Sequence, residues 1–472
     1  MEPDVCYEAL RARDARFDGV FFVGVTTTGI YCRPVCRVRM PGRDRCVFFA
    51  RAAEAERDGY RACFRCRPEL APGHAPMDSV PRLVRAGVAR IEAGALNEGS
   101  VDDLAAELGV TARHLRRAFE TELGVSPIEL AQSRRLALAK QLLQDTALPL
   151  AEVAFASGFQ SVRRFNALFR AHFDRPPTEV RRAHGEGDAS LTLRLDYRPP
   201  LDWDGLVAFF RARAVPGVEV VEGDEIRRGV VVGDRAGVVA LRPAPGRPAL
   251  RATVSASLGP ALMRIVAGLR AMCDLDAHPQ LVADALGRDP LLAPLAARRP
   301  GLRVPGAFDG FELALRAVLG QQVSVRAAAT LAGRLAGRFG RAVTGPGIAR
   351  ALPTAAALAR ASEADVAAVG MPAARARAIV ALARAVDDGL RLAPGADPDA
   401  TMARLRELPG IGEWTAQYVA MRALAWPDAF PAGDLGVRRA LGGMSEAQAE
   451  ARAAAWRPWR AYAVLHLWQQ GE

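Results

Sequence analysis

The 472-residue sequence has almost no lysine, few aromatic residues and no long apolar run. Lys140 is the only lysine, so arginine supplies nearly all of the 63 Lys and Arg side chains and of the formal net charge of +11. A positive charge of this size favours a nucleic-acid partner, although the arginine-rich and alanine-rich composition reflects coding bias as much as phosphate contacts. No stretch approaches about eighteen uninterrupted apolar residues, so we expect no membrane span.

Cysteine is also scarce, and its arrangement argues against a disulfide framework. The seven cysteines are odd in number, and a polar segment at residues 1–4 stands where a signal peptide would begin, so we expect a reducing cytosol. Four of them form two close pairs, Cys32 with Cys36 and Cys63 with Cys66. This spacing suits one tetrahedral Zn²⁺ with four thiolate ligands. An inert structural zinc ribbon is the alternative.

The residues around these pairs, TTGIYCRPVC and YRACFRCRPEL, resemble the N-terminal domain of Ada-type DNA alkylation-response proteins over residues 1–78. The resemblance implies that zinc-bound Cys32 accepts the methyl group of a DNA methyl phosphotriester. A zinc ion with four thiolates is formally anionic and opposes a nearby phosphate, and methylation removes one negative charge. We therefore expect methylation to raise DNA affinity. Neighbouring arginines are expected phosphate contacts: Arg33, Arg37, Arg39, Arg43 and Arg45.

A helix-turn-helix pattern occurs twice in the middle of the chain, at residues 100–123 and again at 150–173. In each copy a glycine, Gly109 or Gly158, marks the turn before the second helix, and polar capping residues mark the helix starts. A long helix at 127–144 joins the copies. An ordinary helical bundle is the alternative.

The two copies, with the segment SGFQSVRRFNALFRAHFDRPPTEVRR, resemble the AraC-type DNA-binding domain. The resemblance implies promoter binding, with RNA polymerase as a partner. Phe165, Leu168, Phe169 and Phe173 recur at helical spacing and are expected in the core. The outward side chains of each second helix are candidates for reading base edges in successive major grooves: Arg113, His114 and Arg117 in the first copy, and Ser161, Arg163 and Arg164 in the second.

Linkers are predicted at residues 71–76 and 184–188, and the periodicity changes after the second. Apolar and polar residues alternate over 191–196, and valine-rich runs flank the turn-forming segment 233–237, so we expect strands and a hairpin. A helix at 204–213 follows the first strand. Its aromatic residues are expected to cover one face of the sheet: Trp203, Phe209 and Phe210.

Helices return from residue 259 onward, and the segment LRELPGIGEWTAQYVAMRAL contains an LPGIG hairpin. Gly410 and Gly412 would let backbone N–H groups approach a DNA phosphate at a helix start. A tight helix connection is the alternative. With LRAVLGQQVSVRAAATLAGRL upstream and PAGDLGVR downstream, residues 190–472 resemble an AlkA-type 3-methyladenine DNA glycosylase of the helix-hairpin-helix superfamily.

This resemblance implies hydrolysis of the N-glycosidic bond of alkylated bases of the 3-methyladenine and 7-methylguanine type. Asp434 would stabilise the oxocarbenium-like cation and orient water, with a helix N-cap as its alternative role. The flipped base would stack on Trp414, Tyr418 and Trp468, unless these rings are simply core. Trp414 stands where lyase relatives have lysine, and Gln322 stands where the family has an apolar DNA wedge. Hairpin carbonyls are implied to hold a monovalent cation: those of Arg406, Leu408 and Ile411.

Together these patterns predict a mainly α multidomain chain with α+β parts. The expected domains are a small zinc-bound α/β module with four cysteine ligands at 1–78, a double helix-turn-helix bundle at 79–184, a small antiparallel sheet plus helix at 190–258, and an all-α glycosylase at 259–472. We expect a cytoplasmic monomer that acts on double-stranded DNA as a monofunctional glycosylase, a suicidal methyl acceptor and an adaptive-response regulator. A methylation-sensing transcription factor with an inactive glycosylase half is the alternative. Repair of O6-methylguanine is not expected, because the Pro-Cys-His-Arg motif is absent.

Overall fold

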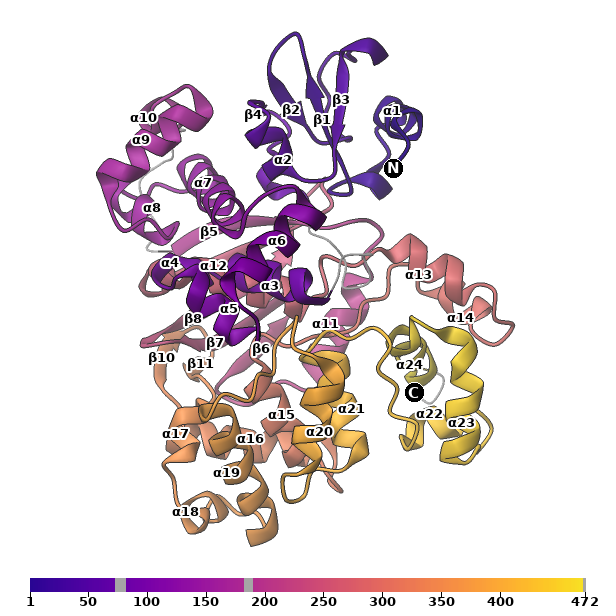
Figure 1. The fold of residues 1–472 in the computed structure, drawn as a ribbon. Coiled ribbons are helices and arrows are strands. Elements are labelled where there is room, and N and C mark those ends of the chain that lie inside the picture. Colours follow the sequence, from indigo (N-terminus) through magenta and orange to yellow (C-terminus); the bar gives the residue numbers. More distant parts are fainter. Residues whose placement is uncertain (73–81, 182–189, 470–472) are drawn as a thin grey trace. The chain divides into compact units, whose positions relative to one another are not determined.

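The computed structural model describes residues 1–72, 82–181 and 190–469 (Figure 1). The predicted linker at 184–188 and most of the one at 71–76 lie outside these residues. Among the described helices, none is long and apolar enough to cross a membrane. The chain forms two compact units: the first has residues 1–199, 244–267 and 275–277, and the second has 200–243, 268–274 and 278–472.

The first unit begins with a four-stranded sheet in the order β3-β1-β2-β4. Strand β1 is antiparallel to β2 and β3, whereas β4 runs parallel to β2. Val23 and Tyr31 are almost fully buried in it. The elements are α1 (Pro3–Ala12), β1 (Phe22–Val25), β2 (Ile30–Cys32), β3 (Cys46–Phe49), α2 (Ala52–Arg57) and β4 (Arg61–Ala62).

Both helix-turn-helix copies are present. At the first, Ser100 Oγ accepts the backbone N–H of Asp103 over 3.1 Å, as a capping box requires. Gly109 and Gly158 adopt φ of +70° and +86°, a left-handed turn that favours glycine. The predicted phenylalanines are buried, and Leu168 is half-buried. The helices are α3 (Arg82–Glu92), α4 (Ala95–Glu98), α5 (Val101–Glu107), α6 (Ala112–Leu123), α7 (Pro127–Asp145), α8 (Leu150–Ala156), α9 (Val162–Phe173) and α10 (Pro177–Val180).

The predicted strands form antiparallel pairs. In the first unit, β5 (Ser190–Asp196) pairs with β9 (Ala249–Ser255). In the second unit, β6 (Glu219–Glu222), β7 (Glu225–Val232) and β8 (Arg235–Pro243) form a meander, which turns between β7 and β8 at Gly233 with φ of +63°.

The second unit is otherwise largely helical. Helix α15 (Gly310–Leu319) buries Leu313, Leu315 and Val318. It contacts α16 (Val325–Phe339), α19 (Ala373–Asp387) and α21 (Glu413–Arg422). Strands β10 (Ala342–Gly345) and β11 (Ile348–Arg350) add a hairpin that the sequence pattern did not indicate. The helices are α11 (Trp203–Ala212), α13 (Pro279–Leu286), α14 (Ala293–Arg298), α15 (Gly310–Leu319), α16 (Val325–Phe339), α17 (Ala355–Ala359), α18 (Glu363–Ala367), α19 (Ala373–Asp387), α20 (Pro398–Arg406), α21 (Glu413–Arg422), α22 (Leu435–Ala440), α23 (Glu446–Ala453) and α24 (Arg460–Trp468), while α12 spans Leu262–Met272.

Candidate metal-binding, DNA-binding and catalytic sites

The two cysteine pairs meet at one point. Cys32 ends β2, and Cys63 follows β4, whose parallel pairing with β2 aligns Tyr31 with Ala62. The backbone N–H of Cys63 donates to the Tyr31 carbonyl over 3.0 Å, which extends this alignment to the ligands. The ligand atoms of Cys32, Cys36, Cys63 and Cys66 all lie within 4.8 Å of one another.

A cation is required to hold four thiolates this close together. Burial raises the pKa of the Cys66 thiol, whereas hydrogen bonds within the cluster raise the pKa of Cys32 and lower that of Cys63. Four sulfur donors in a compact group, three of them on buried residues, match the ligand set of structural Zn²⁺. The residues therefore fit zinc.

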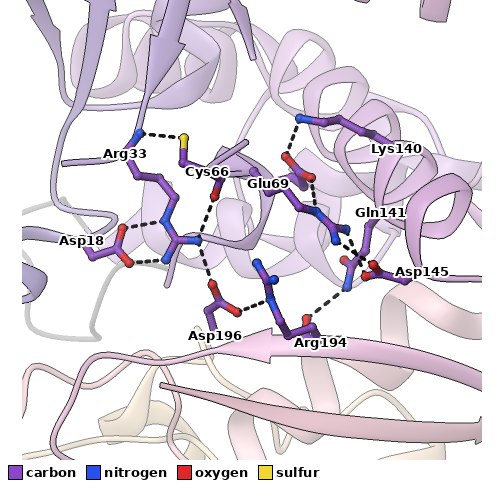
Figure 2. A network of polar contacts seen from close by, with 10 residues as sticks. Asp18, Arg33, Cys66, Glu69, Lys140, Gln141, Asp145, Arg194 and Asp196 are labelled. Carbon is purple, nitrogen blue, oxygen red and sulfur yellow. Dashed lines mark hydrogen bonds and ion pairs between the residues drawn. The ribbon is translucent and has the colours of Figure 1, made fainter. Parts of the chain in front are cut away.

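The Arg33 side chain is buried rather than exposed on the surface. It is 5% exposed, and its guanidinium donates to Asp18 Oδ1 over 2.8 Å and to Asp196 Oδ2 over 2.7 Å (Figure 2). The prediction that Arg33 contacts a DNA phosphate is wrong, because two buried carboxylates already neutralise it. Arg37, Arg39 and Arg45 are exposed, whereas Arg43 is half-buried and bonds to Asp4.

The predicted DNA-reading side chains lie exposed on α6, on α9 or at the N-cap of α9. Ser161 is this N-cap, and its Oγ accepts the backbone N–H of Arg164 over 3.4 Å. The hydroxyl therefore has a structural role besides any contact to a base. The other predicted side chains point outward from regular helices: Arg113, His114, Arg117, Arg163 and Arg164.

Asp434 stands at the wall of a cavity of about 500 Å³ in the second unit. Its Oδ1 accepts the backbone N–H of Val437 over 3.0 Å, so it is the N-cap of α22. The same oxygen accepts the indole N–H of Trp468 over 2.9 Å, and Oδ2 accepts that of Trp414 over 2.9 Å. The alternative role as a cap is therefore real, and the carboxylate also faces the predicted aromatic residues.

The three predicted aromatic rings line the same cavity. Trp414 stacks on Tyr418, with ring centroids 5.1 Å apart and planes inclined by 18°, and Trp468 lies 6.4 Å from Tyr418. All three are partly exposed rather than core. Trp414 and Tyr418 are four residues apart in α21 and so share one helix face, whereas Trp468 is the last residue of α24. The distance between these two helices in space could not be read from the sequence.

Two cavity features were not foreseen. Phe209 and Phe210, predicted to cover a sheet, line the cavity from α11. Arg422, one turn after Tyr418 on α21, is buried, and its guanidinium donates to the Tyr418 hydroxyl and lies 4.7 Å from the Phe209 ring centre. Burial lowers the pKa of Arg422. Its place four residues after Tyr418 is the only signal that the sequence offered.

The LPGIG hairpin joins α20 to α21, with Gly410 at φ of +75° and Gly412 as the exposed N-cap of α21. Gln321 packs against this hairpin: its Nε2 donates to the Gly410 carbonyl over 2.9 Å and to Thr415 Oγ1 over 3.0 Å. The next residue, Gln322, is the predicted DNA wedge; it is exposed, and its backbone φ is +55°.

Comparison with known proteins extends these observations to the whole chain. Residues 5–69 match the metal binding domain of Ada, 104–183 a helix-turn-helix domain, 192–309 the AlkA N-terminal domain, and 315–461 the HhH-GPD superfamily of base excision DNA repair proteins.

Two relatives and one solved structure are informative. A probable bifunctional transcriptional activator and DNA repair enzyme AlkA of Mycobacterium tuberculosis is 41% identical over 477 residues, which cover 98% of this chain and 95% of that protein. DNA-3-methyladenine glycosylase 2 of Escherichia coli is 40% identical over 275 residues, or 58% of this chain and 95% of that enzyme. The structure of 3-methyladenine DNA glycosylase from Archaeoglobus fulgidus matches 58% of this chain and 96% of its own, with 26% identity and a TM-score of 0.51.

The fold and its sites define a DNA repair protein that joins a zinc-binding Ada module and a helix-turn-helix region to a helix-hairpin-helix glycosylase. The chain belongs to the family of bifunctional Ada/AlkA-type transcriptional activators and DNA repair enzymes, since its similarity to the mycobacterial relative extends over nearly its full length.

Proposed function

We propose that the second unit excises alkylated bases of the 3-methyladenine and 7-methylguanine type by hydrolysis of the N-glycosidic bond. The observation that carries this proposal is the pairing of Asp434 with the indole groups of Trp414 and Trp468 inside one cavity. A cationic base is a good leaving group and is attracted to electron-rich rings, so the site needs a stacking surface and one carboxylate.

The carboxylate is held ready for this task. Three N–H groups orient Asp434: one from the backbone of Val437 and two from the indoles. An oriented anion stabilises the developing sugar cation without reorganising, and it can accept a proton from the attacking water. Release of 3-methyladenine from a duplex oligonucleotide, measured by chromatography, tests the proposal. No release by the intact protein would favour the transcription factor with an inactive glycosylase half.

The glycosylase is proposed to be monofunctional, leaving the abasic strand intact. Trp414 replaces the lysine of lyase relatives, and the sole lysine, Lys140, is buried with its ammonium bonded to Glu69. Strand cleavage through a Schiff base needs a free amine at the sugar. Borohydride should therefore trap no covalent complex with alkylated duplex. A trapped adduct would contradict this part of the proposal.

The four-cysteine centre is proposed to accept a methyl group from a DNA methyl phosphotriester on Cys32. The Cys32 sulfur attacks the methyl carbon, an S–C bond forms as the C–O bond breaks, and the phosphate leaves as a diester anion. Zinc would keep the sulfur deprotonated at neutral pH.

Hydrogen bonding favours Cys32 over the other ligands. Backbone N–H groups of Arg33 and Arg65 donate to the sulfurs of Cys66 and Cys63, both over 3.4 Å, and Val38 donates to Cys36. Among the described residues, no backbone donor reaches the Cys32 sulfur. A thiolate that accepts fewer hydrogen bonds is the better nucleophile.

The remaining expectations complete the proposal. The chain would act in the cytoplasm as a monomer, bind promoter DNA through α6 and α9, and contact RNA polymerase. The hairpin carbonyls of Arg406, Leu408 and Ile411 would hold a monovalent cation against a DNA phosphate. The Leu408 carbonyl also accepts the Ile411 N–H over 3.2 Å, so only its second lone pair would be free for the ion.

A further inference from the structure

Lys140 is the only lysine of the chain, and it is 0% exposed. It projects from α7, the long helix between the helix-turn-helix copies, into the four-cysteine module. Its Nζ donates to Glu69 Oε2 over 2.9 Å (Figure 2). It also donates to the carbonyl oxygen of Cys63 over 3.1 Å. The ammonium group therefore bonds directly to the backbone of a metal-ligating residue.

The same ammonium group also lies over two aromatic rings. Its Nζ is 4.8 Å from the ring centre of Phe64 and 5.5 Å from that of Phe173. Phe64 sits between the ligands Cys63 and Cys66, and Phe173 is the last residue of α9. The two rings contact each other with centroids 5.9 Å apart. Lys140 thus lies between the loop from Cys63 to Cys66 and the C-terminal end of α9.

A second ion pair fastens the residues after Cys66 to the same helix. Arg67 donates to Glu69 over 3.1 Å and makes two bonds to Asp145, of 2.6 and 3.0 Å, at the end of α7. Glu69 is therefore shared between Arg67 and Lys140, and its side chain is 3% exposed. Removing one partner of a buried ion pair leaves an uncompensated buried charge and is strongly destabilising, so these pairs hold the residues after Cys66 against α7.

The site suits lysine better than arginine. A compact ammonium with three donors fits between a carbonyl, a carboxylate and two ring faces, whereas a planar guanidinium needs a wider fork of acceptors. The rest of the chain uses arginine in place of lysine, so the lysine at position 140 is explained by the small space between these groups.

We propose that Lys140 is a positioning residue that couples the four-cysteine centre to α9, so that a change at the centre alters how firmly this DNA-facing helix is held. A shift of the loop from Cys63 to Cys66 moves the carbonyl and the Phe64 ring that the ammonium contacts, and the Phe173 ring follows. Only the consequence for DNA rests on the proposed function, in which α9 reads the duplex. Coupling is reciprocal, so DNA held by α9 would change metal retention in turn.

Hydrogen exchange of the full chain tests this coupling. Peptides covering residues 162–173 are compared in zinc-loaded protein and after removal of zinc by a chelator. In the wild type we expect zinc removal to speed exchange in α9 about tenfold, within the usual range of allosteric coupling. In Lys140→Met exchange should no longer depend on zinc, while the Glu69 pair with Arg67 persists. Gln141→Met is the matched control, because this buried neighbour on α7 bonds to the Arg194 carbonyl rather than to the metal loops, and it should keep the zinc dependence.

A second variant keeps the test decisive if Lys140→Met does not fold. Phe173→Leu leaves both hydrogen bonds of the ammonium in place and removes the α9 ring that the ammonium and Phe64 both contact, so it should also uncouple α9 from zinc. The proposal is overturned if α9 of the wild type ignores zinc, if Phe173→Leu and any folded Lys140→Met respond as the wild type does, or if Gln141→Met loses the response equally. Methyl transfer to the wild type is measured separately, so a failure of the proposed function is distinguishable from a failure of this coupling.

Discussion

The indole N–H of Trp414 donates to Oδ2 of Asp434 over 2.9 Å, and Trp468 donates to Oδ1 of the same carboxylate over the same distance. The side chains expected to stack a base therefore also orient the carboxylate expected to act on it. The same two tryptophans serve base stacking and the orientation of the carboxylate, so a substitution of either one also alters the hydrogen bonding of Asp434.

Replacement of Asp434 by Asn should abolish most base excision while leaving the fold largely intact. The Asn carbonyl can still cap α22 at Val437, which limits the loss of capping energy to less than the roughly 0.5–2 kcal/mol of an Ala substitution. The amide N–H₂, however, would face the Trp414 donor, and the loss of that hydrogen bond costs about 0.5–1.5 kcal/mol at this partly exposed site. We expect a fall of about a hundredfold or more in 3-methyladenine release, measured in single turnover.

Asp397→Asn provides the matched control for capping. Asp397 caps α20 by accepting the backbone N–H of Ala400 over 2.9 Å, and it does not line the cavity. Its Asn variant should excise at the wild-type rate. If Asp434→Asn also excises at nearly that rate, Asp434 is only a cap and its catalytic assignment fails.

Tyr418 should act through its ring face more than through its hydroxyl. Tyr418→Phe keeps the stack on Trp414 and loses only the contact to Arg422, so we expect excision within a few-fold of wild type. Tyr418→Leu removes the stacking face and should weaken the reaction about tenfold or more, since stacking on an aromatic side chain contributes about 1–3 kcal/mol per base. Rates on 7-methylguanine duplex decide; equal rates for the two variants would contradict the stacking role.

Cys32→Ser should abolish methyl transfer, whereas Cys46→Ser should not. Both cysteines are buried, but the Cys46 sulfur donates to the Gly42 carbonyl and is not part of the four-sulfur cluster. Loss of one thiolate should also weaken zinc retention against a chelator. Mass spectrometry after incubation with methyl-phosphotriester DNA locates the modified residue. A methyl group on Cys63 would refute the assignment to Cys32.

Local signals in the sequence predicted much of this structure. Capping at Ser100 and left-handed glycines at Gly109 and Gly158 set the helix boundaries of the helix-turn-helix copies, because these features depend on nearest neighbours alone. The two cysteine pairs predicted the metal cluster, because four thiols at this spacing have few other uses.

What the sequence could not predict depends on residues far apart in the chain. Arg33 reads as a phosphate contact until Asp196, over 160 positions later, is seen to pair with it. From the sequence, the single lysine at position 140 suggests only a coding bias, whereas the structure places its ammonium against the Cys63 carbonyl. Phe209, which was expected to cover the sheet, lines the cavity in the structure. No periodicity or capping rule reports such partners, since they are brought together only by tertiary packing.

The second unit should lose stability in acid because of His466. This side chain is 4% exposed, and its Nδ1 has no hydrogen-bond partner among the described residues. Burial lowers its pKa to about 4. An unfolded histidine takes up its proton near pH 6.5, so as the pH falls from there toward 4 only the unfolded state is protonated, and unfolding is favoured. The expected loss is roughly 3 kcal/mol over this window.

Tryptophan fluorescence can isolate this effect, because all six tryptophans lie in the second unit. Urea unfolding of the wild type at pH 7.5 and pH 4.5 is compared with that of His466→Leu, which replaces the imidazole by an apolar side chain. The variant should lose less stability between the two pH values, with a difference of about 2–3 kcal/mol. Other titrating groups act equally in both proteins and cancel. If the two proteins lose the same amount, His466 is protonated in the folded state and the pKa shift is absent.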